Sequence, residues 1–200
     1  RSSTEKKREP VKNVDDFFFY FKRVYRVFVI TVILFMGYMF FLTISPVYLT
    51  DIAGSSNSMG WIVLCSGIIH AITAPYAGNL IDMYPRESAI RIASLFVIFS
   101  MLAYSFSVNI YAITLVFTIP IYMTFFLGAR TIVADTVPYD LRARMMGLLS
   151  SFSLLGSGLG SLIVGELLLS YQEQQVFLFG ALIALIAFAL SLKNFSQSKN

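Results

Sequence analysis

The stretch VFVITVILFMGYMFFLTISPVYL, residues 27–49, decides the fold class because it contains no charged residue. An α-helix rises about 1.5 Å per residue, so a run of this length crosses the roughly 30 Å hydrocarbon core of a bilayer. The polar residues DIAGSSNS, 51–58, follow it and supply the turn formers that end such a helix. The stretch therefore predicts a transmembrane helix.

The remainder of the 200 residues repeats this pattern. Hydrophobic residues make up 57% of the chain and charged residues only 13%, about half the charged share of an ordinary soluble domain. This composition excludes a water-soluble globule and predicts an all-α membrane protein. Short polar joints separate six apolar segments. We expect membrane helices over residues 24–48, 59–81, 90–106, 110–133, 145–169 and 176–192.

The basic residues occur at alternate joints only. All 15 lysines and arginines precede the first segment, flank the second and fourth joints, or follow the last segment. The other three joints carry only Asp51 and Glu173 as charged residues. Because short cytoplasmic loops carry excess lysine and arginine, the alternation predicts a plasma-membrane protein with both ends of this segment cytoplasmic. The net charge of +4 then reflects topology and does not indicate nucleic-acid binding.

We divide the chain into a cytoplasmic leader, 1–23, a transmembrane unit, 24–192, and a cytoplasmic tail, 193–200. The leader is too long and acidic for the first part of a signal peptide, so we expect the chain to belong to a longer protein. Its lysines and arginines fit the excess of basic residues expected on the cytoplasmic side. The alternative is that they form a surface that binds anionic lipids. The segment DDFFFYFKRVYRVF, 15–28, could lie as an amphipathic helix in the membrane interface.

Polar side chains inside apolar segments mark the faces that point toward protein or water. In segment 59–81, Ser66, His70 and Thr73 lie on one helical stripe. An imidazole titrates near neutral pH, so His70 is a candidate cavity residue or proton carrier, with a structural interhelical hydrogen bond as the alternative. Hydroxyl stripes in other segments could line the same cavity, although such groups also bond to their own helix. The candidate cavity residues are Tyr38, Ser66, His70, Thr73, Thr118, Tyr122 and Ser153.

Small residues mark a packing face in segment 145–169. Gly156 and Gly160 form a small-xxx-small pair within GLLSSFSLLGSGLGSLIVGE, residues 147–166. Because small side chains let membrane helices approach closely, we expect a helix contact there.

The sequence contains none of the enzyme motifs considered below. With one cysteine, Cys65, and one histidine, His70, the chain alone cannot build a Cys/His metal site. The Gly-x-Ser-x-Gly turn of serine hydrolases and the Gly-x-x-x-x-Gly-Lys phosphate loop are both missing from the sequence. We therefore expect no enzyme, no metal and no cofactor, which leaves transport, conduction or scaffolding.

The joint AGNLIDMYPRES, residues 77–88, resembles the loop motif of the major facilitator superfamily, usually Gly-x-x-x-Asp-Arg-x-Gly-Arg-Arg/Lys. Gly78, Asp82 and Arg86 match it. Where the family has an arginine, a glycine and a final basic residue, this chain has Met83, Pro85 and Glu87.

A second resemblance covers GARTIVADTVPYDLRARMMGLLSSFSLLGSGLGSLIVGELL, residues 128–168. This segment is similar to the family's crossing from the tenth to the eleventh helix, through Pro138, Arg142 and Gly147. The leader resembles the family's central loop, so the resemblance covers essentially the whole chain. It implies helices seven to twelve, arranged as two inverted three-helix repeats in half of a twelve-helix fold.

The resemblance implies secondary active transport by alternating access around a midplane site. Asp82, together with Gly78, Arg86 and Arg142, would form a cytoplasmic gating motif against the N-terminal six-helix half of the same polypeptide. The weakly charged hydroxyl and aromatic stripes favour an antiporter that exports amphipathic, drug-like molecules in exchange for protons. Uptake of a metabolite or organic acid, or a six-helix channel or scaffold subunit, are the alternatives. The expected partners are a small-molecule substrate, protons, the lipid bilayer and that half, and not nucleic acid.

Overall fold

The computed structural model describes residues 14–119 and 121–192, except the side chains at 14–15, 56, 77–78, 80–82, 86 and 121–125. This part of the chain is helical throughout, with short turns between helices. Its helices are α1 (Val14–Ala53), α2 (Ser56–Met83), α3 (Arg86–Phe106), α4 (Ile110–Phe117), α5 (Ile121–Thr136), α6 (Tyr139–Leu168) and α7 (Glu173–Leu192). The all-α prediction is therefore confirmed for the described residues.

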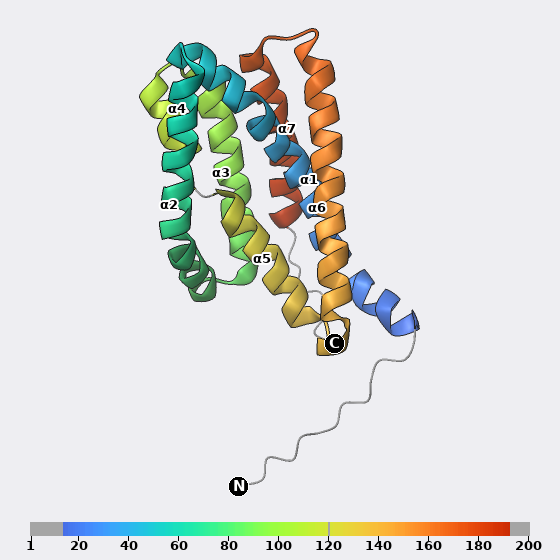
Figure 1. Cartoon of the computed structure of the whole chain (residues 1–200). Coiled ribbons are helices and arrows are strands. Elements are labelled where there is room, and N and C mark those ends of the chain that lie inside the picture. Colours follow the sequence, from blue (N-terminus) through green and yellow to red (C-terminus); the bar gives the residue numbers. More distant parts are fainter. Residues whose placement is uncertain (1–13, 120, 193–200) are drawn as a thin grey trace.

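The helices run up and down one bundle (Figure 1). The start of α1, the α2–α3 and α5–α6 joints and the end of α7 gather at the same end. We call this the basic end, because the lysines and arginines with described side chains lie in the helix turns nearest to it. Within the described residues, five helices are long and apolar enough to cross a membrane: α1, α2, α3, α6 and α7.

The prediction of one continuous helix over 110–133 is wrong, because α4 and α5 occupy this segment separately. Ile119 donates its N–H to the carbonyl of Val116 at 3.3 Å, a bond that tightens the final turn. Pro120, outside the described residues, has no N–H and its ring excludes the carbonyl four residues earlier, which breaks a helix. The two pieces, of 8 and 16 residues, rise about 12 and 24 Å and together still cover one crossing.

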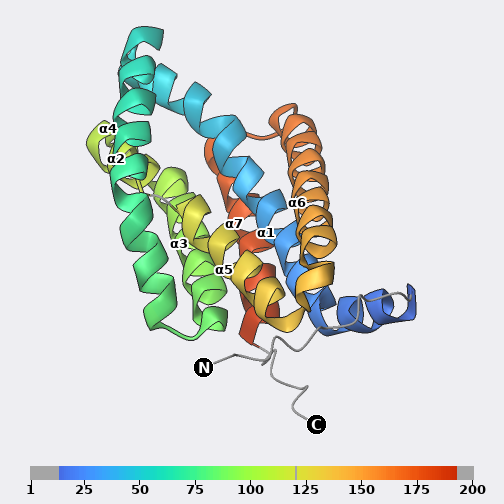
Figure 2. The same cartoon turned by 60° about the horizontal axis from the view of Figure 1, so that its bottom comes forward.

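Helix α1 forms the centre of the bundle. It packs against α6 and α7, and α3 packs in turn against α7 and α5 (Figure 2). In its most apolar stretch α1 is 56% buried, whereas the corresponding stretch of α2 is only 11% buried. Because lipid is as apolar as leucine, close packing rather than the hydrophobic effect holds such helices together. The closest-packed residues of α1 include Phe28, Leu34, Phe40, Ile44 and Leu49, which are all buried.

The first turns of α1 run across the foot of the bundle before the helix turns into it (Figure 2). At 40 residues, α1 would extend about 60 Å, twice the thickness of the hydrocarbon core. Phe18 and Phe19 are exposed on these turns, and the guanidinium carbon of Arg23 lies 4.3 Å from the centroid of the Phe19 ring. Exposed aromatic rings beside cations fit the amphipathic interfacial helix expected for 15–28.

Candidate substrate site at the broken helix

The break between α4 and α5 lies against the polar stripe of α2. Ser66 of α2 is 3% exposed, and its hydroxyl donates to the carbonyl oxygen of Phe117 across 3.4 Å. Phe117 is the last residue of α4, where carbonyls have no partner within their own helix. The hydrogen bond therefore satisfies a group that the break exposes and connects two helices.

His70 extends this contact by one turn. Its Nε2 lies 3.5 Å from the Ser66 hydroxyl oxygen. A hydroxyl has one proton, and Ser66 gives that proton to Phe117, so Ser66 can only accept from the imidazole. With a proton on Nε2 of His70, the contacts form a path from imidazole through hydroxyl to carbonyl.

Aromatic rings connect the same place to α1. The rings of Tyr38 and Phe41 stack at 6.1 Å between centroids, and Phe41 stacks on Phe117 at 5.7 Å. We call Tyr38, Phe41, Ser66, His70 and Phe117 the break cluster. It combines stacked rings, a hydroxyl and an imidazole from α1, α2 and α4.

The other predicted cavity residues lie at different places. Thr118 follows Phe117 directly and donates to the carbonyl of Leu115 at 2.7 Å. Thr73 lies one turn beyond His70 and donates to the carbonyl of Ile69 at 2.7 Å, so both hydroxyls bond to their own helix.

Ser153 does not join the break cluster. It is buried on α6 and donates to the carbonyl of Ser150 at 2.7 Å. The neighbouring Phe152 contacts the ring of Phe28 on α1, which places Ser153 closer to the basic end than Tyr38. The side chain of Tyr122 lies outside the described residues.

The predicted gating motif is described in part. Arg142 is exposed, and its Nε donates to the carbonyl of Val137 at 3.2 Å, so it bridges the α5–α6 joint. The side chains of Asp82 and Arg86 and the surroundings of Gly78 are not described, although Gly78 and Asp82 lie in the last turns of α2.

The glycine pair of α6 faces α1. A Cβ atom on Gly156 would collide with the backbone carbonyl of Val32, and one on Gly160 would lie 2.5 Å from the carbonyl oxygen of Met36. These glycines let the two helices approach until their backbones nearly touch.

A polar lock at the opposite end of the bundle was missed by sequence reasoning. The Gln174 side chain donates to the Tyr48 hydroxyl at 3.0 Å, and that hydroxyl donates to the carbonyl of Ser107 at 3.2 Å. Ser105 donates to the carbonyl of Gln174 at 2.9 Å, so the lock joins α1, α3 and α7. The only available signal was that these polar residues lie near segment ends, which is ordinary for membrane proteins.

Residues 27–199 match the family described as Major Facilitator Superfamily. The chain belongs to this family. Over 171 residues it is also 26% identical to Multidrug resistance protein 1 of Bacillus subtilis (strain 168). That alignment covers 80% of this chain and 41% of the relative, so the chain spans less than half of the relative's length.

Family membership confirms the predicted family and its all-α fold. Together with the long apolar helices, it identifies an integral membrane protein of a transporter family, whose members are not enzymes. The half of the family fold that this chain represents stays a prediction, as does the side of the membrane that the basic end faces.

Proposed function

We propose that this chain forms helices seven to twelve of a transporter that exports amphipathic, drug-like molecules in exchange for protons. The family match over residues 27–199 carries this proposal, because the family fold implies alternating access. The similarity to a protein named for multidrug resistance supports export over uptake of a metabolite or organic acid.

Two open helix faces support a second six-helix half as the partner. We call a helical glycine open when a Cβ atom added to it would meet no atom within 4 Å. Among the described helical glycines, all the open ones lie on α2 and α6. Large apolar side chains are exposed on these two helices, such as Trp61 and Leu154, and also on α3 and α7, such as Phe99 and Ile186, so the open glycines alone distinguish α2 and α6. Because small residues mark helix contacts in membranes, we assign the open faces to the N-terminal half. The open glycines are Gly60, Gly67, Gly147, Gly158 and Gly165.

The break cluster is this chain's contribution to the substrate site. It lies at α2, one of the two helices that carry an open face. Its stacked rings suit flat, apolar parts of a substrate, and His70 supplies the one imidazole that can exchange a proton. A substrate bound between the two halves would contact both the stacked rings and the imidazole of His70.

Asp82 acts in this proposal as a latch at the cytoplasmic side. Its position in the last turns of α2 brings it to the basic end, where the carboxylate can meet a helix N-terminus of the partner half. Arg86 belongs to the same loop motif and Arg142 to the second segment that resembles the family, and pairing of Asp82 with Arg86, Arg91 or Arg142 is the local alternative.

Reconstituted vesicles test the transport proposal. The intact protein is placed in proteoliposomes, and an imposed proton gradient should drive accumulation of ethidium, a flat amphipathic dye. Addition of a protonophore should abolish the accumulation, and empty vesicles provide the control. Accumulation of citrate but not ethidium would favour the uptake alternative.

The mass of the intact polypeptide from its native membrane tests the two-half arrangement. About twice the mass of these 200 residues is expected when a second six-helix half is present. A mass matching this chain alone would favour a six-helix channel or scaffold that pairs with itself.

A further inference from the structure

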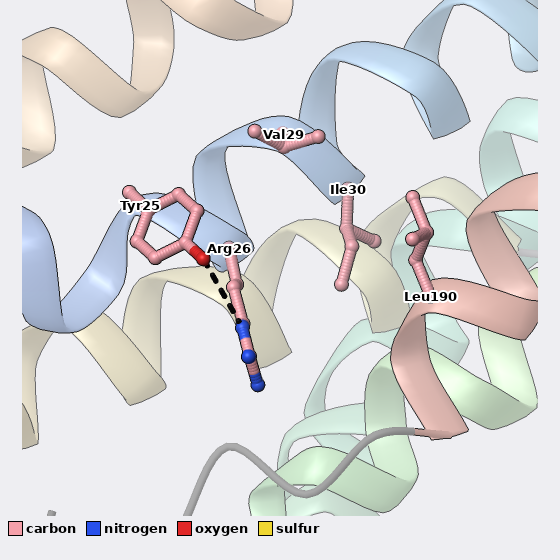
Figure 3. A pocket seen from close by; sticks show the side chains of 5 residues that line it. All are labelled: Tyr25, Arg26, Val29, Ile30 and Leu190. Atoms are coloured by element: carbon pink, nitrogen blue, oxygen red, sulfur yellow. Dashed lines mark hydrogen bonds between the residues drawn. The ribbon is translucent and has the colours of Figure 1, made fainter. Parts of the chain in front are cut away.

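A groove between α1 and α7 at the basic end has no role in the transport proposal. It encloses about 210 Å³ and is lined by Tyr25, Arg26, Val29, Ile30 and Leu190. Figure 3 shows the first four side chains along α1, and Leu190 facing Ile30 from α7. The groove therefore combines an aliphatic wall with a phenol and a guanidinium.

Arg26 is half-buried as a residue, and its guanidinium is available to an anion. Its Nε lies 3.5 Å from the Tyr25 hydroxyl oxygen, and its terminal nitrogens extend beyond that contact (Figure 3). Within the described part of the chain, the ion pair present joins Arg91 to Glu87, and no carboxylate pairs with Arg26. A weakly hydrated guanidinium beside apolar walls suits a phosphate, which it binds through two parallel N–H···O bonds.

The depth of the groove matches the level of lipid phosphates. Arg26 is the last charged residue before the uncharged run 27–50, and Leu190 lies two residues before the end of α7. The exposed rings of Phe18 and Phe19 lie two turns earlier on α1, where the helix crosses the foot of the bundle. Tyrosine is enriched at the membrane interface, and Tyr25 lines the groove, so the groove opens where a phospholipid passes from phosphate to acyl chain.

Two further cations favour a lipid with net negative charge. Lys22 and Arg23 lie four and three residues before Arg26, which places all three along neighbouring positions of one helix face. Both are exposed. A zwitterionic headgroup would bring its own cation next to this cluster, whereas an anionic headgroup would not.

We propose that the groove binds one anionic phospholipid, with the phosphate on Arg26 and an acyl chain over Val29, Ile30 and Leu190. The bound lipid contacts α1 and α7 together and holds them at the membrane surface. This site depends on the chain lying in a membrane and is independent of which substrate the protein moves.

Native mass spectrometry of the intact protein in detergent tests the site. The protein is titrated with phosphatidylglycerol or with phosphatidylcholine of the same chains. We expect one phosphatidylglycerol to bind preferentially, and Arg26→Gln to weaken its binding about tenfold, as for the loss of a charged hydrogen bond. Arg144→Gln is the matched control, because it removes the same charge from an exposed residue near the basic end that does not line the groove.

A second variant tests the apolar wall without changing charge. Val29 is 43% exposed, so Val29→Trp should be tolerated and should fill the groove and displace the lipid. Equal binding of the two lipids, equal effects of Arg26→Gln and Arg144→Gln, or unchanged binding in Val29→Trp would each overturn the proposal. Displacement of the lipid by millimolar inorganic phosphate would also overturn it, because the groove would then be a site for a free anion.

Discussion

Ser66 of α2 donates a hydrogen bond to the backbone carbonyl of Phe117 at the broken end of α4, across 3.4 Å. A helix that ends inside a bilayer leaves carbonyls without donors, and lipid offers none. A hydroxyl on the neighbouring helix provides one of the missing donors here. The break is therefore contacted by a side chain 51 residues away in the sequence.

Replacement of Ser66 by alanine should lower the free energy of unfolding by about 0.6 kcal/mol, the average for hydrogen bonds between membrane helices, and by no more than about 1.7 kcal/mol, the largest such value. The matched control is Ser100→Ala, because Ser100 is equally buried but donates to Phe96 of its own helix. Thermal unfolding in detergent compares the two variants. Equal loss of stability would mean that the contact between α2 and α4 contributes nothing specific.

Replacement of His70 by glutamine should flatten the pH dependence of transport if the imidazole carries the exchanged proton. Glutamine retains an N–H that can reach the Ser66 hydroxyl, so the fold should survive. Ser66→Ala in the same assay separates loss of the hydrogen bond from loss of the titratable group. A pH profile identical to that of the unmodified protein would remove His70 from the proton path.

The broken helix shows where sequence reasoning reaches its limit. Pro46, Pro75 and Pro120 all lie within apolar runs, yet α1 and α2 continue through the first two. Around Pro46, the neighbouring Ile44 and Leu49 are buried against other helices, so packing can hold both sides of the proline in line. Such packing is a property of the tertiary structure and cannot be read from the local sequence.

The candidate site was predictable only in part, because one of its contacts also depends on the tertiary structure. Helical spacing alone places Ser66 and His70 on one face, and the structure joins them. Their partner, the carbonyl of Phe117, becomes available only because α4 ends there, so no side-chain pattern indicated it. Ser153 looked equivalent to these residues by composition, but it lies on the α6 stripe that includes Gly156.

Replacement of Gly156 by alanine should destabilise the bundle by about 1 to 3 kcal/mol, the usual cost of overpacking. The added methyl group would meet the backbone of Val32, which cannot move aside as a flexible side chain would. Ala189→Val is the control, because it enlarges an exposed side chain on α7, away from the faces assigned to the N-terminal half. Unfolding in detergent provides the comparison, and similar stabilities for the two variants would contradict a tight contact between α1 and α6.

Replacement of Asp82 by asparagine should slow transport while leaving the unfolding temperature unchanged. The substitution keeps the size of the side chain and removes only the charge that attracts a helix N-terminus. Asp140→Asn removes an exposed carboxylate from the first turn of α6 and serves as the control. Transport rates are measured in proteoliposomes, and a rate equal to that of the control would argue against the latch.

Replacement of Tyr48 by phenylalanine should loosen the polar lock at the end of the bundle opposite the basic end. The hydroxyl accepts from Gln174 and donates to the carbonyl of Ser107, so its removal leaves two partly buried groups without their partner. A cost of about 1 to 3 kcal/mol follows for such unsatisfied groups.

Tyr111→Phe is the control for Tyr48→Phe, since Tyr111 is 84% exposed and also lies near that end. Hydrogen exchange at the first turn of α7 reports local opening, and it should accelerate in Tyr48→Phe alone. Because Gln174 lies in that turn, unchanged exchange there would mean that ring packing of Tyr48 on Phe177, at 5.8 Å between centroids, holds α1 and α7 together without the hydrogen bonds.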